Sequence, residues 1–459
     1  MFKKIEIWIL YLVILVGVIF TIGFGALVRY ELLGGQVLKS INAEWLPKVA
    51  LNLAEIPVSV KRILEGIDSD LSVDDRFPTL DGFDGSPNSE ESYLLLSRYD
   101  GDLQEGVVEL VDLRSFKVLH TWNPDIDAFN DLVEQVDEFK YLNRDVNNSR
   151  HLLRHPQLTK DGGLFWKYGG PLRKIDACSN LVFQSTHDYF HHSIETDIDG
   201  NIWVPSHLYP QSLPAAKVGR DNMLEGGFID DAIVKLSSDG EILFEKSVSQ
   251  IFIDNGLEYL LFSVGDNRFD TDPIHLNDIQ PVDFDGEYWK KGDVFLSLRH
   301  QSMVFLYRPS TNEIVWKGTG PFFHQHDVNI LDDHRISVFN NNVKILFEKK
   351  IVDGSNEVII YDFKTNRYSS YLQDSLFTND IRTMTEGRSQ ILPSGDLFIE
   401  ESNFARTLYF NADGSLRWTH VNRADNQKVY VVSWSRILYT QEDIQIVNNF
   451  LEKKGICNE

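Results

Sequence analysis

Histidines recur at equivalent places in a repeating sequence pattern, and imidazole is a side chain that can do chemistry near neutral pH. His192 lies eight residues before Gly200 and His326 lies eight residues before His334, where Gly200 and His334 occupy the same position of a recurring turn. His275 begins the corresponding strand of another repeat. A neutral imidazole serves as a nucleophile or as a general acid or base, and three converging imidazoles can also hold zinc or copper.

Polar residues follow the same turn at a second fixed spacing. Seven residues after the turn position stand Arg299 after Gly292, His207 after Gly200 and Asn341 after His334. A guanidinium beside imidazoles opposes a bound cation and favours an anion. We therefore expect an anionic substrate and no metal ligands, and a metal-dependent histidine site stays open as the alternative.

The turns themselves indicate the elements that position these residues. Short β-rich runs from residue 92 onward alternate with turns such as Asp199-Gly200-Asn201, Ser394-Gly395-Asp396 and Asp413-Gly414-Ser415. Two kinds of turn recur in each of five units, and residues 93–122 supply a sixth. This repeat predicts an all-β fold, a six-bladed β-propeller whose innermost strands line an axial channel. A large β-sandwich is the rival, but it would not repeat its turn chemistry in register.

The N-terminus predicts the compartment. Residues 7–28 carry no charge and are long enough, as a helix, to cross a membrane, while Lys3 and Lys4 precede them. Positive charge before the first span keeps that end in the cytoplasm. We expect an uncleaved single-pass anchor in the inner membrane with the rest of the chain in the periplasm. A cleaved signal peptide is the alternative.

We divide the chain by composition. The predicted parts are a transmembrane anchor at residues 1–30, a helical stalk and acidic linker at 31–91, the propeller at 92–440, and a tail at 441–459 that is a candidate helix. Lys+Arg total 44 and Asp+Glu total 68, a net charge of −24, which argues against nucleic acid as a partner. The two cysteines, Cys178 and Cys457, allow one disulfide at most.

Several motifs resemble the bacterial aryl sulfotransferase family that works without the nucleotide sulfate donor PAPS. The resemblance covers residues 191–418 and rests on five segments: HHSIETDIDGNIWV, DPIHLNDIQ, FLSLRHQSMVFLYRPSTNEIVWKGTG, HQHDVNILDDHRISVFNNN and GRSQILPSGDLFIEESNFARTLYFNADGSLRW. It implies a periplasmic six-bladed propeller that transfers a sulfuryl group from a phenolic sulfate ester to a phenol through a sulfohistidine. Blade two and the N-terminal region depart from the family pattern.

The resemblance also implies roles for individual residues. His326 in Gln325-His326-Asp327 becomes the nucleophile, and His192, His275 and Arg299 complete the catalytic site. A further set of substrate-binding residues is predicted at Asn277, His207 and His324. The residue types suit this chemistry, because Arg299 can fork onto two oxygens of a transferring sulfuryl group. No phosphate-binding loop is found in the sequence, so no cofactor is expected.

One rival function lies outside the enzymes. A membrane-tethered propeller can be a binding module that only retains these residues, since fold does not imply activity. Turnover of an aryl sulfate distinguishes the two interpretations.

Overall fold

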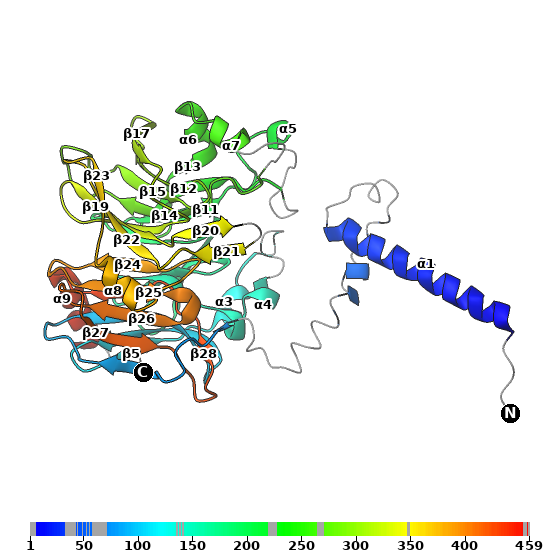
Figure 1. Cartoon of the computed structure of the whole chain (residues 1–459), viewed down its shortest axis with the longest axis horizontal. Helices are drawn as coiled ribbons and strands as arrows, with labels where there is room; N and C mark the ends of the chain where they lie inside the picture. The colour runs from blue at the N-terminus through cyan, green and yellow to red at the C-terminus, as the bar shows by residue number, and fades with distance from the viewer. Residues whose placement is uncertain are drawn as a thin grey trace. The chain divides into compact units, whose positions relative to one another are not determined.

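The computed structural model describes residues 6–32, 71–134, 142–218, 227–263, 270–346 and 349–452, with isolated residues between these ranges. The chain divides into two compact units. The first contains the long helix α1 (Ile7–Leu32), drawn in blue in Figure 1. The apolar side chains of this helix are exposed. Its segment Ile7–Tyr30 has a mean hydropathy of 2.7. The helix extends about 39 Å at 1.5 Å per residue, so it has the length and composition of a membrane span or of a signal sequence.

Of the predicted stalk and linker, residues 31–91, positions 33–42 and 57–70 fall outside the described residues, and the described positions between 45 and 56 are helical. The second unit holds all the strands that the structure describes, and it is mostly β with a propeller-like arrangement of sheets (Figure 1).

Three antiparallel sheets have four strands each. In spatial order they are β29 (Arg436–Leu438), β3 (Tyr93–Asp100), β4 (Glu105–Asp112) and β5 (Lys117–Trp122); β14 (Leu276–Pro281), β15 (Val294–Leu298), β16 (Met303–Arg308) and β17 (Glu313–Gly318); and β18 (His326–Ile330), β19 (Arg335–Asn340), β22 (Glu357–Asp362) and β23 (Arg367–Ser370). A five-stranded sheet has the order β2 (Gly82–Gly85), β27 (Leu416–Val421), β26 (Arg406–Phe410), β25 (Leu397–Glu401) and β24 (Arg388–Ile391).

The remaining strands form one large sheet and two small ones. An eight-stranded sheet runs β13 (Ile242–Ser247), β12 (Asp231–Leu236), β11 (Ile202–His207), β9 (Leu181–Phe190), β8 (Gly170–Ile175), β7 (Leu164–Lys167) and β6 (Arg154–Leu158), with β10 (Glu195–Thr196) paired to β11. The small sheets pair β1 (Ser72–Val73) with β28 (Val429–Tyr430) and β20 (Val343–Leu346) with β21 (Lys349–Val352).

Short helices occupy the connections between strands. They are α3 (Ile126–Asn130), α4 (Leu142–Asp145), η4 (Asn148–Arg150), α5 (Ala215–Val218), α6 (Val248–Asp254), α7 (Tyr259–Phe262), α8 (Gln373–Thr378) and η6 (Ser402–Phe404). The tail forms α9 (Gln441–Glu452).

The recurring turns have the backbone conformation that their glycines suit. Gly200 and Gly240 have φ of +82° and +87°, in the left-handed region that glycine enters at little cost. Gly200 lies between β10 and β11, and Gly240 lies between β12 and β13. Each turn returns the chain antiparallel, which is why the repeated Asp-Gly signal produces repeated strand pairs.

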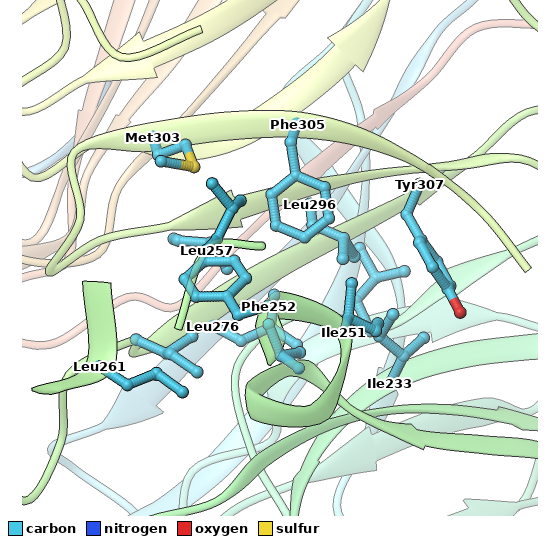
Figure 2. Packing of buried hydrophobic residues seen from close by; sticks show 14 of the residues in the cluster. Ile233, Ile251, Phe252, Leu257, Leu261, Leu276, Leu296, Met303, Phe305 and Tyr307 are labelled. Atoms are coloured by element: carbon cyan, nitrogen blue, oxygen red, sulfur yellow. The ribbon is translucent and has the colours of Figure 1, made fainter. Parts of the chain in front are cut away.

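Apolar side chains between neighbouring sheets form the largest core cluster. Figure 2 shows how α6, α7 and the connection between them place Phe252, Leu261 and Leu257 against residues of β14 to β16, among them Leu296 and Phe305. Burying each of these side chains contributes about 1.5–3 kcal/mol, so this cluster fixes the start of β14, where the candidate site begins.

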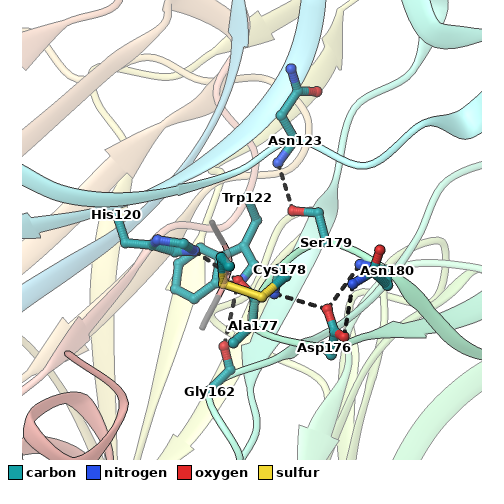
Figure 3. The surroundings of a disulfide bond; sticks show 10 residues. His120, Trp122, Asn123, Gly162, Asp176, Ala177, Cys178, Ser179 and Asn180 are labelled. Atoms are coloured by element: carbon teal, nitrogen blue, oxygen red, sulfur yellow. Dashed lines mark hydrogen bonds between the residues drawn. A yellow bond between two sulfur atoms is a disulfide. The ribbon is translucent and has the colours of Figure 1, made fainter. Parts of the chain in front are cut away.

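The two ends of the second unit are joined. The short strand β29 pairs with β3, through Arg436 and Leu95, so a C-terminal strand completes the sheet built by the first strands after residue 92. A disulfide joins Cys178 to Cys457, and its surroundings include Trp122, which donates to the Gly162 carbonyl (3.1 Å; Figure 3). These contacts hold the tail against the sheets.

Residues 71–91 were expected to be part of an acidic linker, and the structure places strands there. β2 pairs with β27 along its whole length, and β1 pairs with β28. The ring of Phe83 lies 4.5 Å from that of Phe116 and 5.5 Å from that of Trp418. An apolar anchor within the acidic stretch therefore attaches the segment to the sheets.

Candidate functional site

Three histidines that the sequence singled out meet at the ends of strands. His192 lies between β9 and β10, His275 immediately precedes β14, and His326 is the first residue of β18. The ring centroid of His192 lies 4.9 Å from that of His275 and 6.5 Å from that of His326. His192 and His275 have φ of +57° and +54°, a conformation unusual for residues other than glycine and often found at functional sites.

One of the three histidines does not occupy the strand position that the sequence predicted for it. Ser193 Oγ, Asp278 Oδ2 and Asp327 Oδ2 each accept a backbone N–H from the next innermost strand, at Ile279, Val328 and Ser389. The residues preceding these three acceptors are therefore equivalent: His192, Asn277 and His326. His275 lies two residues before that position and still reaches His192 from there.

The hydrogen bonds of His326 define which of its nitrogens carries the proton. Its Nδ1 lies 2.6 Å from Oδ1 of Asn341, whose own amide donates to the carbonyls of Thr383 (3.2 Å) and Glu386 (2.8 Å). Asn341 must therefore accept, so Nδ1 of His326 carries the proton and Nε2 carries the lone pair. The backbone N–H of Glu386 approaches this Nε2 at 3.3 Å. Burial, and then the charge of Arg299, hold the pKa of His326 well below its ordinary value, which keeps the imidazole neutral.

Arg299 is fixed by its neighbour in the chain. One Nη1–H donates to Nε2 of His300 (2.9 Å), and Nδ1 of His300 donates to the backbone carbonyl of Asp272 (2.6 Å). The Asp272 carboxylate accepts from Nδ1 of His275 (2.7 Å). Arg299 is buried, and its Nε has no hydrogen-bond partner. These bonds leave Nε2 of His275 and part of the guanidinium available to a ligand.

Two predicted substrate-binding residues lie at this cluster. Asn277 is fully buried, donates to the carbonyl of Gln325 (2.8 Å) and has no partner for its Oδ1. The ring of His324 lies 6.2 Å from that of His300, and burial together with the charge of Arg299 lowers the pKa of His324 to about 4. Both residues therefore line the surroundings of Arg299 and His326.

The third, His207, is on a different side of the cluster. It ends β11, its ring lies 3.9 Å from that of His191, and its Nε2 lies 3.4 Å from Oδ1 of Asp231. It approaches the other histidines through His191, whose Nδ1 lies 2.7 Å from Nδ1 of His192.

In the described part of the chain, three groups of histidine and aspartate side chains bring together atoms that could bind a metal ion. The groups are His191, His207 and Asp231; Asp272, His275 and His300; and Asp332, Asp333 and His334.

Sequence reasoning missed several groups that hold the site together. Asp272, three residues before His275, and His300, next to Arg299, were both visible as neighbours of predicted residues. Lys167 gave no signal in the sequence, because its strand lies before residues 191–418, where the motifs resemble the family. Its side chain is buried, and this burial lowers the pKa of Lys167 well below its ordinary value.

Comparison with known proteins identifies one similar family. A family model described as Arylsulfotransferase (ASST) matches residues 155–423. No curated protein is similar enough to match the chain. Among solved structures, a protein of unknown function from Bacteroides caccae is 12% identical, covers 76% of this chain and 99% of its own, and has a TM-score of 0.45. The Pan2 WD40 domain of Neurospora crassa is 8% identical, covers 74% of this chain and 88% of its own, with a TM-score of 0.36.

Proposed function

The chain belongs to the arylsulfotransferase family, and from this premise we propose that it transfers a sulfuryl group from a phenolic sulfate ester to a phenol. Transfer proceeds through a sulfohistidine on His326 and needs no nucleotide donor. The observation that carries this proposal is the tautomer of His326. Its Nδ1 holds the proton against Asn341, so the neutral ring keeps a lone pair on Nε2, which the backbone N–H of Glu386 approaches at 3.3 Å. His192, His275 and Arg299 act with it as catalytic residues, and Asn277 and His324 contact the substrate.

The first half of the reaction forms a nitrogen–sulfur bond. Nε2 of His326 attacks the sulfur of the aryl sulfate, and the bond between sulfur and the phenolic oxygen breaks. The leaving phenolate takes a proton from His275, whose imidazolium form the Asp272 carboxylate stabilises at 2.7 Å from Nδ1. In the second half, His275 removes the proton of the acceptor phenol, whose oxygen attacks sulfur and releases Nε2 of His326. Two simpler transfers replace one difficult transfer.

Charge on the transferring group is met by fixed donors. The sulfuryl oxygens carry negative charge in the transition state, and Arg299 is permanently charged and already oriented by His300. The backbone N–H of Glu386 is beside Nε2 and donates to an oxygen of the adduct. Groups that are in place before reaction do not have to reorganise when the charge develops.

We further propose that the fold is a six-bladed propeller. The eight-stranded sheet divides into β6–β9 and β10–β13, since β9 and β11 pair only at Phe190–Ser206 and Tyr189–His207. With the other sheets this makes six innermost strands, β6, β10, β14, β18, β24 and β29. Arg436 of β29 supports this ring, because its guanidinium bonds both to the Pro156 carbonyl of β6 and to Glu195 of β10.

We also propose that α1 anchors the chain in the inner membrane and leaves the sheets in the periplasm. Lys3 and Lys4 before the helix favour that orientation, and the Cys178–Cys457 disulfide suits an oxidising compartment.

The intact mass of the protein tests the reaction. After brief exposure to nitrophenyl sulfate without acceptor, we expect one added sulfuryl group on a peptide that contains His326. His326→Ala should remain unmodified and inactive, whereas His334→Ala, which changes a histidine of the β18–β19 turn, should behave as the wild type. Turnover without any histidine adduct would mean direct transfer and would contradict the sulfohistidine step.

A further inference from the structure

A second group of side chains converges beside His192, which it contacts through His191. His207 ends β11 and Asp231 begins β12, and the two residues face each other in the strand register. Nε2 of His191 lies 3.1 Å from Oδ1 of Asp231, and Nε2 of His207 lies 3.4 Å from the same oxygen. Asp231 is fully buried and the side chain of His191 is one-tenth exposed. Two imidazoles and one carboxylate thus direct one atom each toward a common point.

The hydrogen bonds around this point are incomplete. Nε2 of His191 and Oδ1 of Asp231 are both buried and lie 3.1 Å apart, yet their orientation gives neither atom a well-aligned hydrogen bond. The other carboxylate oxygen, Oδ2, accepts the backbone N–H of Leu276 (3.2 Å). A buried polar atom without a partner is costly and calls for an explanation. A cation that accepts the lone pairs of both atoms would supply the missing interaction.

We propose that Nε2 of His191, Nε2 of His207 and Oδ1 of Asp231 bind a divalent transition metal ion of the zinc class. Imidazole nitrogens and carboxylate oxygens bind such ions at about 2.0–2.2 Å, which places ligand atoms roughly 3 to 3.5 Å from one another in tetrahedral or octahedral geometry. The two distances to Oδ1 lie in this range. His207 is partly exposed, so water can complete the coordination.

The ligand atoms of the other two convergent groups are already used in other interactions. In the group of Asp272, His275 and His300, Oδ1 of Asp272 also lacks a partner, but the ring nitrogens that face Asp272 already make hydrogen bonds of 2.7 and 2.6 Å. In the group at the β18–β19 turn, Asp332 is occupied by the Arg335 guanidinium.

The metal would set the protonation of a catalytic residue, a consequence that rests on the proposed function. With Nε2 of His191 on the metal, its proton sits on Nδ1, which donates to Nδ1 of His192 at 2.7 Å. His192 then carries its own proton on Nε2 and donates it to a sulfuryl oxygen. Without a metal, His191 is free to hold its proton on Nε2 beside Asp231, and His192 would then present a lone pair to an anion. The metal therefore makes His192 a hydrogen-bond donor.

Cobalt substitution tests metal binding independently of activity. The full-length protein, solubilised in detergent and treated with a chelator, is titrated with Co²⁺ and followed by the visible absorption of the bound ion. We expect saturation at one Co²⁺ per chain. Asp231→Asn and His207→Ala should each weaken binding by at least about tenfold, which is a loss of about 1.4 kcal/mol or more. His207 is partly exposed, so its variant is the one expected to keep the fold.

Two controls locate the ion. Asp272→Asn and His334→Ala, which alter the other two groups, should bind Co²⁺ as the wild type does. Absence of saturable Co²⁺ absorption in the wild type, unchanged binding in both Asp231→Asn and His207→Ala, or loss of binding in Asp272→Asn would each overturn the proposal. Because the readout is absorption, a failure of the sulfotransferase assay leaves this result unaffected, and the two proposals can fail separately.

Discussion

Replacing Asn341 by alanine tests whether the orientation of His326 matters for catalysis. Asn341 touches no substrate in the proposed reaction and contacts the nucleophile at 2.6 Å through Nδ1 of His326. It is a positioning residue. Asn356 provides a matched control, because it is also a buried asparagine of the same network, bonded to the carbonyls of Asn341 and Thr383 at 2.8 Å each, yet it does not contact His326.

The size of the effect follows from the change in charge on the ring. When Nε2 of His326 bonds to sulfur, the imidazole becomes positive, and its hydrogen bond to Asn341 strengthens from about 0.5–1.5 kcal/mol to about 1.5–3 kcal/mol. The difference, about 1–1.5 kcal/mol, is gained in the transition state and amounts to roughly a tenfold loss of kcat in Asn341→Ala. KM should change little, because the bond is present both before and after substrate binds.

Steady-state turnover of nitrophenyl sulfate with a phenol as acceptor measures kcat and KM. Both variants should lose stability, because each removes hydrogen bonds to buried carbonyls worth about 1 kcal/mol or more apiece. Only Asn341→Ala should lose kcat, and nitrogen NMR of labelled protein should show the proton of His326 no longer confined to Nδ1. If Asn341→Ala and Asn356→Ala lower kcat equally, the reasoning from tautomer to rate is wrong.

Three further changes have defined outcomes. Arg299→Lys should lower kcat/KM about a hundredfold, since a fixed two-pronged donor is lost, whereas the exposed Arg114→Lys should not; a smaller drop than tenfold would contradict the role of Arg299. Burial, and then the charge of Arg98, lower the pKa of His420 to about 3, below its unfolded value of 6.5, so the unfolded chain binds the proton first. Its contribution to stability is complete above pH 6.5 and declines as pH falls toward 3, by about 1.4 kcal/mol per pH unit, which urea unfolding of wild type and His420→Gln measures. Cys178→Ser should reduce the free energy of unfolding by about 2–4 kcal/mol and speed proteolysis of α9; unchanged cleavage would show that packing alone holds the tail.

The sequence predicted the strands, and it predicted that His192 and His326 share one position in their strands. Both predictions were possible because the turns and these histidines recur at a fixed spacing. The distance from His192 to Gly200 equals that from His326 to His334, and equal spacing in a repeated sheet means equal position. His275 was placed in the same register by analogy, and the hydrogen bonds give that register to Asn277 instead. The inserted hairpin before β15 hides the true spacing from the sequence.

Contacts between distant segments could not be predicted from such periods. β29 is three residues long and has no turn signal, yet it completes the sheet of β3. Arg299 is held in place by His300, which in turn bonds to Asp272. His326 is held by Asn341, whose amide bonds to the Glu386 carbonyl, 45 residues further along the chain from Asn341. These partners are set by how the strand ends meet, which is a property of the folded sheets.

Arg299 meets two requirements of the reaction that would otherwise conflict. A nucleophilic histidine must stay neutral, while the pocket that receives an anion must be positive. In a chain of net charge −24, Arg299 supplies the local positive charge, and that charge, together with burial, lowers the pKa of His326. The cation that attracts the sulfate ester thus also protects the lone pair that attacks it. Acidification should therefore leave His326 reactive well below pH 6.5, and a loss of single-turnover adduct formation with a midpoint near 6.5 would show that this coupling is absent.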